Sequence, residues 1–269
     1  MNRIDAKFAQ LKSGNRKGLI PFVTAGDPST HGVAALMHAL VAAGADLVEL
    51  GVPFSDPMAD GPVIQHASER ALANGVGLTQ ILGWVREFRT KDASTPVVLM
   101  GYLNPVEIYG DERFARDAVA AGVDGVLLVD CPVEEGEAMR PMRAAGLRRI
   151  LLAAPTTTDA RLVAACEQAE GFLYYVSFAG ITGADRLSFA TVRERVAAIR
   201  KKAHTPIAVG FGVKDAASAR EIAGFADAVV IGSALVERLA GAASTQAACA
   251  AARDFLAPIR AALDQPRGA

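Results

Sequence analysis

The chain has 269 residues, of which 51% are hydrophobic and 21% charged, with a formal net charge of −1 at pH 7. This composition predicts a globular protein with an ample core, and the balanced charge without a basic stripe argues against nucleic acid as the main partner. No run approaches the roughly 18 consecutive apolar residues of a membrane span, and residues 1–12 lack the apolar core of a signal peptide. We therefore expect a cytoplasmic protein with a small ligand and no membrane partner.

Short β-branched apolar runs alternate with alanine-rich helical patterns along the chain. After a first helix at about residues 2–12, we predict strands at about 18–24, 46–51, 96–101, 124–129, 148–153, 171–177, 206–210 and 226–231, and then a long helical pattern from about 234 to 263. Near-continuous apolar strands separated by helices indicate a parallel sheet covered on both faces. Because no flexible linker divides the chain, we predict a single-domain (β/α)8 TIM barrel over residues 1–269, with an extra N-terminal helix, in preference to an open doubly wound sheet.

Glu49 departs from the apolar pattern of the second predicted strand. Three segments share one template, an aspartate followed by an apolar run: AGADLVELG at 43–51, AGVDGVLLV at 121–129 and FADAVVIGS at 225–233. Where the first segment has Glu49, the other two have Leu127 and Val230. A buried carboxylate is unfavourable unless it is paired or neutralised, so Glu49 is either part of a structural ion pair or a working group. We favour the working group, because perturbed carboxylates concentrate at functional sites.

Two more acids follow this strand. The loop GVPFSDPMADGP at 51–62 carries Asp56 and Asp60, and the loops after the strands form the active site of a TIM barrel. Two carboxylates with separated pKa values suit acid/base chemistry, and we expect Glu49 to have the raised pKa while the loop carboxylates stay ionised. Ordinary turn chemistry is the alternative explanation for Asp56 and Asp60.

Glycines gather after the last three predicted strands. Gly183 follows the sixth strand, Gly210 and Gly212 lie at the end of the seventh, and Gly232 and Ser233 follow the eighth. Loops of this kind and a helix N-terminus commonly hold phosphate in barrels. A tight turn explains each glycine equally well, but together they favour a phosphate site.

Aromatic residues at strand ends supply the remaining feature. Most aromatics on strands belong to the core, but several at one barrel mouth would suit a flat apolar group on the ligand: Phe22, Tyr102, Tyr174, Tyr175 and Phe211. The three cysteines are far apart and show no ligand spacing, so we predict small buried residues and no metal site: Cys131, Cys166 and Cys249. The residues thus predict a phosphorylated small molecule handled by two carboxylates.

The segment VELGVPFSDPMADGP at 48–62 resembles the signature of the tryptophan synthase alpha subunit family. Other segments resemble the family in its own order and nearly from end to end: PFVTAGDP at 21–28, MGYLNP at 100–105, GITG at 180–183, GFGV at 210–213 and IGSA at 231–234. The resemblance implies retro-aldol cleavage of indole-3-glycerol phosphate to indole and glyceraldehyde 3-phosphate, without a cofactor. It also implies a partner, the pyridoxal-phosphate-dependent beta subunit of an α2β2 complex, which would receive indole through a tunnel and condense it with serine to make L-tryptophan.

The resemblance also implies residue roles. Glu49 would take a proton from the glycerol hydroxyl and protonate indole C3, while Asp60 would stabilise positive charge at the indole nitrogen. Asp56 would face the beta subunit, and Thr182 would close the segment 177–188 over the substrate and bond Asp60. The remaining positions would surround the indole or the phosphate: Phe22, Met100, Tyr102, Leu127 and Tyr174 for the first, and Gly183, Gly212, Gly232 and Ser233 for the second.

Two positions depart from the pattern of many relatives, which have leucine at Met100 and, in some cases, arginine at Phe178. The first change conserves volume, whereas the second could alter loop closure or partner contacts. Three alternatives remain: a stand-alone lyase that releases indole, another phosphate-binding barrel enzyme, or a non-catalytic subunit that only binds its partner. The presence of both Glu49 and Asp60 argues against the last two.

Overall fold

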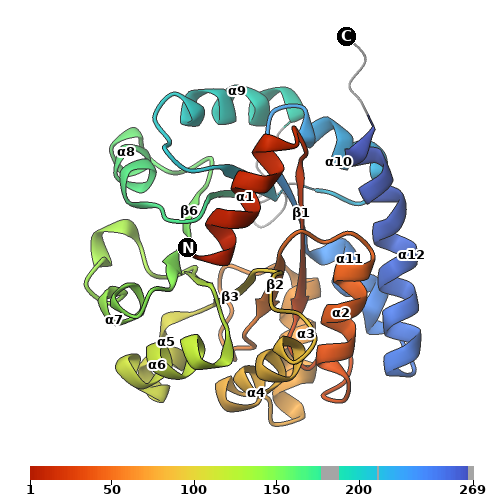
Figure 1. Cartoon of the computed structure of the whole chain (residues 1–269). Coiled ribbons are helices and arrows are strands. Elements are labelled where there is room, and N and C mark those ends of the chain that lie inside the picture. Colours follow the sequence, from red (N-terminus) through yellow and green to blue (C-terminus); the bar gives the residue numbers. More distant parts are fainter. Residues whose placement is uncertain (177–187, 211, 266–269) are drawn as a thin grey trace.

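Parallel strands form the centre of the molecule (Figure 1). The computed structural model describes residues 1–176, 188–210 and 212–265. The strands pair in the order β5-β4-β3-β2-β1-β9-β8-β7-β6. Their bounds are β1 Gly18–Thr24, β2 Val48–Gly51, β3 Val97–Gly101, β4 Gly125–Leu128, β5 Arg148–Arg149, β6 Leu151–Ala153, β7 Leu173–Val176, β8 Ile207–Gly210 and β9 Ala228–Ile231.

The two ends of this sheet meet, because β5 and β6 occupy one strand position on either side of Ile150. β5 pairs with β4 and β6 pairs with β7, while the Ile150 amide donates to the Val126 carbonyl over 3.0 Å. The predicted strand at 148–153 is therefore divided into two short strands. The structure confirms the (β/α)8 barrel expected from the alternating pattern.

Helices surround the strands in Figure 1. Their bounds are α2 Val33–Ala42, α3 Pro62–Ala73, α4 Leu78–Arg89, α5 Leu103–Tyr109, α6 Asp111–Ala121, α7 Arg140–Ala144, α8 Asp159–Gln168, α9 Phe189–Arg200, α10 Ala216–Ala223, α11 Ser233–Ala240 and α12 Thr245–Asp264, with a 3-10 turn at Val133–Glu135. The helical pattern expected from about 234 to 263 is two helices. Gly241 ends α11, and the Ser244 hydroxyl caps α12 by accepting the Ala247 amide over 3.1 Å.

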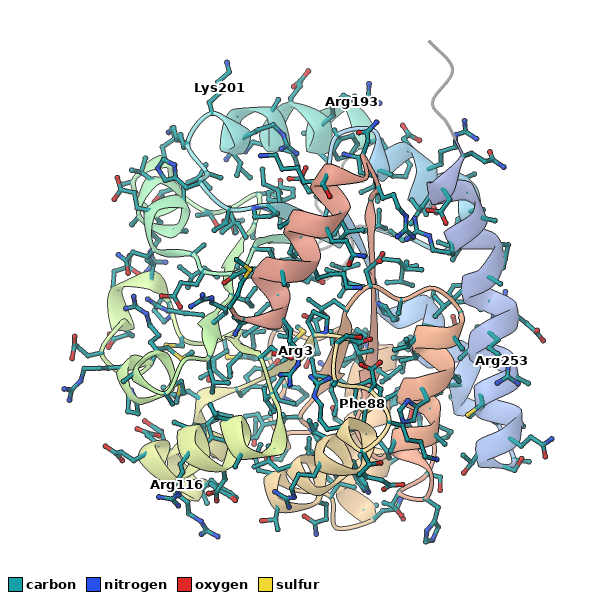
Figure 2. The ribbon with its side chains drawn as sticks, in the orientation of Figure 1. Arg3, Phe88, Arg116, Arg193, Lys201 and Arg253 are labelled. Carbon is teal, nitrogen blue, oxygen red and sulfur yellow. The ribbon has the colours of Figure 1, made fainter. Side chains whose placement is uncertain are left out.

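Apolar side chains fill two layers of this fold. One layer lies between the strands and the outer helices and includes Phe88, which Figure 2 places inside the molecule, whereas Lys201 points outward. The second layer fills the barrel interior, with members from most strands: Ile20, Leu47, Val98, Leu127, Phe172, Tyr174, Ala208 and Val230. The barrel is therefore a packed core whose working surface must lie at one end.

The extra helix α1 (Arg3–Ser13) closes the N-terminal end of the barrel, as Figure 1 shows. The Asn2 side chain caps it by accepting the Ile4 amide over 2.9 Å. Ile4, Phe8 and Leu11 then pack into the interior apolar layer. This arrangement leaves the opposite end, where the strands terminate, as the barrel mouth.

Four carboxylates, here called the carboxylate clamps, tie neighbouring strand positions together at the closed end. Three of them are the aspartates shared by the related segments, and the fourth is a glutamate. Each accepts the backbone amide of a residue in the adjacent strand: Asp46 from Leu19 (3.0 Å), Asp124 from Val97 (2.9 Å), Glu170 from Arg149 (3.1 Å) and Asp227 from Ile207 (2.9 Å). The shared aspartate therefore marks a repeated structural role.

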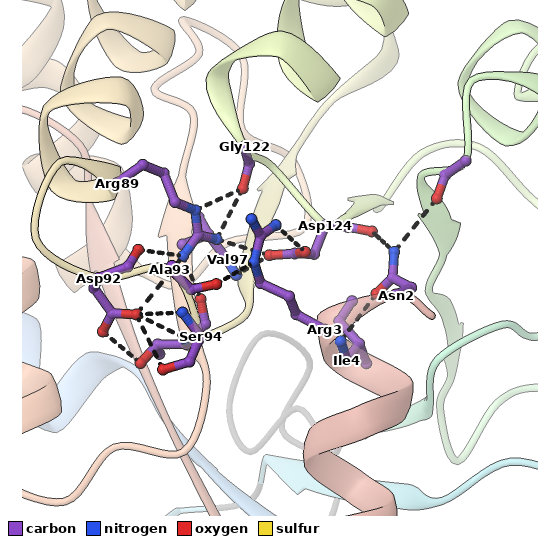
Figure 3. A network of polar contacts seen from close by, with 12 residues as sticks. Asn2, Arg3, Ile4, Arg89, Asp92, Ala93, Ser94, Val97, Gly122 and Asp124 are labelled. Carbon is purple, nitrogen blue, oxygen red and sulfur yellow. Dashed lines mark hydrogen bonds and ion pairs between the residues drawn. The ribbon is translucent and has the colours of Figure 1, made fainter.

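Arginines from the outer helices complete the carboxylate clamps. The ion pairs are Arg260 with Asp46 (2.9 Å), Arg89 with Asp124 (2.8 Å), Arg143 with Glu170 (3.0 Å) and Arg200 with Asp227 (3.1 Å). Figure 3 shows Asp124 bonded to both Arg89 and Arg3, and the Arg3 bond of 2.9 Å comes from α1. Charged hydrogen bonds of this kind fix the closed end, which in TIM barrels serves stability.

All three cysteines are buried and free, as predicted: Cys131, Cys166 and Cys249. Burial raises the pKa of each thiol, so these side chains act as small core residues. In the part of the chain that the structure describes, no helix is long and apolar enough to cross a membrane.

Candidate active site

Glu49 points into the barrel interior near the mouth. It lies on β2, two residues after Leu47, which directly precedes the strand, so both side chains share the inward face. Glu49 is 0% exposed, and neither carboxylate oxygen has a hydrogen-bond partner among the described residues. Burial, and secondly the nearby Asp60 carboxylate, raises its pKa to about 8. The corresponding residues Leu127 and Val230 belong to the interior apolar layer, so the template comparison identified a real exception.

Asp60 reaches the same region from the loop between β2 and α3. Gly61 caps α3 and Pro62 begins it, which fixes the point where the loop ends. The Tyr102 hydroxyl donates to Asp60 Oδ2 over 3.1 Å. Burial raises the Asp60 pKa to about 6, and the bond from Tyr102 opposes that rise.

These two carboxyl groups have separated pKa values. Between about pH 6 and pH 8, Glu49 is mostly protonated while Asp60 is mostly ionised. Because the two groups interact, the values belong to the pair as a unit. The arrangement provides one proton donor and one fixed negative charge, as acid/base chemistry at neutral pH requires.

A pocket opens beside Asp60 at the barrel mouth. Three predicted ligand-contact residues from the ends of two strands line it together: Phe22 on β1, Met100 on β3, and Tyr102 directly after β3. Phe22 is 4% exposed, and its ring lies so close over Gly51 that a Cβ atom there would come within 2.5 Å of it. Only glycine at position 51 therefore leaves room for the Phe22 ring, which forms one wall of the pocket.

Leu127 and Tyr174 belong to the interior apolar layer, and Leu127 on β4 pairs in register with the pocket residue Met100 on β3. Tyr174 is buried, and burial, followed by the Glu49 and Asp60 carboxylates, raises its pKa well above the ordinary value. The Tyr174 hydroxyl covers Gly210, where a Cβ atom would approach it to 2.5 Å. Close packing thus explains Gly210, which the sequence pattern had grouped with the phosphate glycines.

The glycine-rich rim follows the neighbouring strands β8 and β9. Gly212 is exposed and has a positive φ of 53°, and Ser233 is exposed at the first position of α11, directly after Gly232. A Cβ atom on Gly232 would lie 3.8 Å from the Phe22 ring, so this rim borders the pocket. The first amides of a helix have no partner within it and suit an anion.

Some predicted positions lie outside the described residues. They are Thr182 and Gly183, together with Phe178, most of the segment 177–188 and Phe211. The predictions made for them stay predictions.

The structure separates Asp56 from Asp60. Asp56 is exposed, accepts a bond from the Ser55 hydroxyl over 2.5 Å, and lines a surface groove with Met58, which is 80% exposed. Asp60 instead lines the pocket at the barrel mouth. The two neighbouring acids therefore face different surroundings.

Sequence reasoning missed several pocket residues, including Thr24, Ile64 and Ser68. Thr24 lies two residues after Phe22 on β1, and this spacing places both on one face of the strand. Its buried hydroxyl has no partner within the described part of the chain. Among those residues, no group of three or more histidine, cysteine, aspartate or glutamate side chains could hold a metal ion.

Comparison with known proteins gives consistent matches. The family model described as tryptophan synthase alpha chain matches residues 8–262. Tryptophan synthase alpha chains of Xylella fastidiosa (strain 9a5c) and Xanthomonas euvesicatoria pv. vesicatoria (strain 85-10) are 59% and 58% identical, covering 98% of this chain and 99% and 100% of their own lengths. The crystal structure of tryptophan synthase subunit alpha from Legionella pneumophila str. Paris is 44% identical with a TM-score of 0.92, covering 98% of this chain and 99% of that one.

Proposed function

Because the chain belongs to the tryptophan synthase alpha chain family, and is a lyase that cleaves indole-3-glycerol phosphate to indole and glyceraldehyde 3-phosphate, we propose that Glu49 and Asp60 carry this reaction. The observation that supports the proposal most directly is the buried Glu49 carboxyl group, which has a raised pKa of about 8 and no partner among the described residues. A group kept protonated at neutral pH beside an ionised one fits a proton transfer to carbon.

The substrate would lie with its indole ring in the pocket and its phosphate at the glycine-rich rim. Phe22, Met100 and Tyr102 line the pocket, and Met100 packs against the interior apolar layer that contains Leu127 and Tyr174. The phosphate would meet the amides at the start of α11 and the loop after β8, through Gly212, Gly232 and Ser233. Gly183 and Thr182, outside the described residues, are the remaining proposed contacts.

The reaction would proceed through two proton transfers by one residue. Protonated Glu49 gives its proton to indole C3, and the Asp60 carboxylate stabilises the positive charge at the ring nitrogen. Glu49 then takes the proton of the hydroxyl group on the carbon attached to C3. The bond between that carbon and C3 breaks, its electron pair returns to the ring, and the hydroxyl carbon becomes the aldehyde. Glu49 ends protonated, ready for another cycle.

We further propose that a beta subunit receives the indole and joins this chain in an α2β2 complex. Asp56, exposed beside Met58, would contribute to that interface. Pyridoxal phosphate would belong to the beta subunit, since proton transfer by Glu49 and charge stabilisation by Asp60 suffice for the cleavage. The chain would form one domain over residues 1–269 and would act in the cytoplasm.

The test is indole release from indole-3-glycerol phosphate by the purified chain. Glu49→Gln and Asp60→Asn should each lower the rate by at least about 100-fold, because each removes a charge or proton while keeping the side chain's size. Asp56→Asn and Glu69→Gln, which change exposed carboxylates nearby, are the matched controls and should keep the rate of the isolated chain. Unchanged circular dichroism would exclude unfolding. A variant of either proposed catalytic residue with a tenth of the original rate would contradict the assignment.

A further inference from the structure

Tyr102 is held rigidly at the mouth of the barrel. It is the residue between β3, which ends at Gly101, and α5, which begins at Leu103. The Leu103 amide donates to the Asp130 carboxylate over 2.8 Å, which fixes the start of α5 from the neighbouring loop. Tyr102 itself is only 3% exposed. Its side chain therefore projects from a fixed point of the barrel frame.

This side chain contacts the loop at residues 52–61 in three places. The Tyr102 hydroxyl accepts the Ala59 amide over 3.0 Å and donates to Asp60 Oδ2 over 3.1 Å. The ring also packs against Phe54, with the ring centroids 5.1 Å apart. A phenol has one proton to donate and lone pairs to accept, and this hydroxyl uses both capacities on adjacent residues of one loop.

We propose that Tyr102 is a positioning residue for the cleavage reaction. Its hydroxyl fixes the position of the loop at residues 52–61 and orients the Asp60 carboxylate toward the pocket. This role is distinct from packing against the indole ring, for which a phenylalanine would serve equally well. The proposal rests on the catalytic assignment of Asp60 made above.

The same hydrogen bond controls the charge of Asp60. Burial raises the Asp60 pKa to about 6, and the Tyr102 bond limits that rise by favouring the ionised form. The other titratable groups that bear on this pair are Glu49 on β2, Tyr174 on β7 and Asp130 after β4. Glu49 and Tyr174 are neutral at pH 7 by these shifts, so the Tyr102 hydroxyl is a principal stabiliser of the Asp60 charge.

Tyr102→Phe tests the role, because it keeps the ring and its contact with Phe54 while removing the hydroxyl. The Asp60 pKa, followed by carboxyl-carbon NMR with the Asp60→Asn variant to identify the signal, should rise by about one unit. The Ala59 amide should exchange with solvent at least about tenfold faster, since it loses its acceptor. At pH 7 the rate of indole release should fall by at least about tenfold. In the pH–rate profile, the acidic limb should move to higher pH by the same shift as the Asp60 pKa.

Tyr109→Phe is the matched control. Tyr109 lies at the end of α5, and its hydroxyl donates to Asp117 over 2.9 Å, away from the pocket. Removing that bond should leave the Asp60 pKa, the Ala59 exchange rate and the reaction unchanged.

An unchanged Asp60 pKa and unchanged Ala59 exchange in Tyr102→Phe would overturn the proposal, whatever happened to the rate. Both measurements use the free protein, so they stand apart from the catalytic assignment. If the Asp60 pKa and the Ala59 exchange rate changed as expected while Asp60→Asn stayed active, Tyr102 would still be shown to position Asp60, but the catalytic role of Asp60 would be refuted.

Discussion

Replacing Glu49 by glutamine should make the folded chain more stable, and increasingly so as the pH rises. Glu49 is 0% exposed and unpaired among the described residues, and its pKa rises from 4.5 to about 8 on folding. The amide of glutamine occupies the same space and is equally polar, but it never ionises. The difference between the two proteins therefore isolates the free energy of placing a negative charge in the barrel interior.

The pH dependence of this stability difference follows from proton binding to Glu49 in the folded and unfolded forms. Below about pH 4.5 both the folded and unfolded forms are protonated at Glu49, so the charge contributes nothing. Between about 4.5 and 8 only the unfolded form loses the proton, and the free energy of unfolding should fall by about 1.4 kcal/mol for each pH unit. Above about 8 both forms are ionised, and the loss levels off on the order of 5 kcal/mol.

Urea unfolding at pH 5, 6.5 and 8, followed by circular dichroism, measures this difference. Glu49→Gln should unfold at nearly the same urea concentration as the parent at pH 5 and at a clearly higher one at pH 8. Glu87→Gln changes an exposed carboxylate on α4 in the same way, so it controls for the general effect of removing one negative charge. If Glu49→Gln and the parent gave parallel curves across this range, the raised pKa of Glu49 would be refuted.

Three further outcomes test the proposed site. Asp56→Asn should leave indole release by the isolated chain unchanged but reduce its stimulation by an added beta subunit severalfold; full stimulation would remove Asp56 from the interface. Ser233→Asp should raise the KM for indole-3-glycerol phosphate by at least about tenfold, because the new carboxylate repels the phosphate at the start of α11. Free indole, measured by calorimetry, should still bind. Equal losses of affinity for both ligands would indicate a collapsed pocket. The rate of indole release should have a bell-shaped pH dependence. It should rise near about pH 6 as Asp60 ionises and fall near about pH 8 as Glu49 loses its proton. A rate that stays constant from pH 5 to 7 would contradict the requirement for ionised Asp60.

The sequence predicted those features that depend on local periodicity. The apolar runs located the strand positions, and the exception at Glu49 was visible because two related segments show what the strand otherwise requires. Breaks inside a continuous pattern were harder to predict. Ile150 divides one strand position, and Gly241 ends a helix within an alanine-rich stretch, although neither interrupts the apolar periodicity around it.

Features that depend on side chains meeting in space could not be predicted from one sequence. Gly210 looked like part of a phosphate loop, but the Tyr174 hydroxyl lies where its side chain would be. Tyr102 looked like one more aromatic, and its two bonds to the loop at residues 52–61 became visible only in the fold. Both depend on the direction of a tyrosine that starts from a different strand.

The carboxylate clamps at the closed end also bear on how the chain folds. Their backbone bonds join residues 27, 27, 21 and 20 positions apart, so each spans one strand, its connection and the next strand. The arginine that reaches Asp46 comes instead from 214 positions away. Contacts between residues near in sequence require less loop closure and form earlier. Four local β-α-β units can thus assemble during synthesis, before α12 arrives from the C-terminus to secure the first of them.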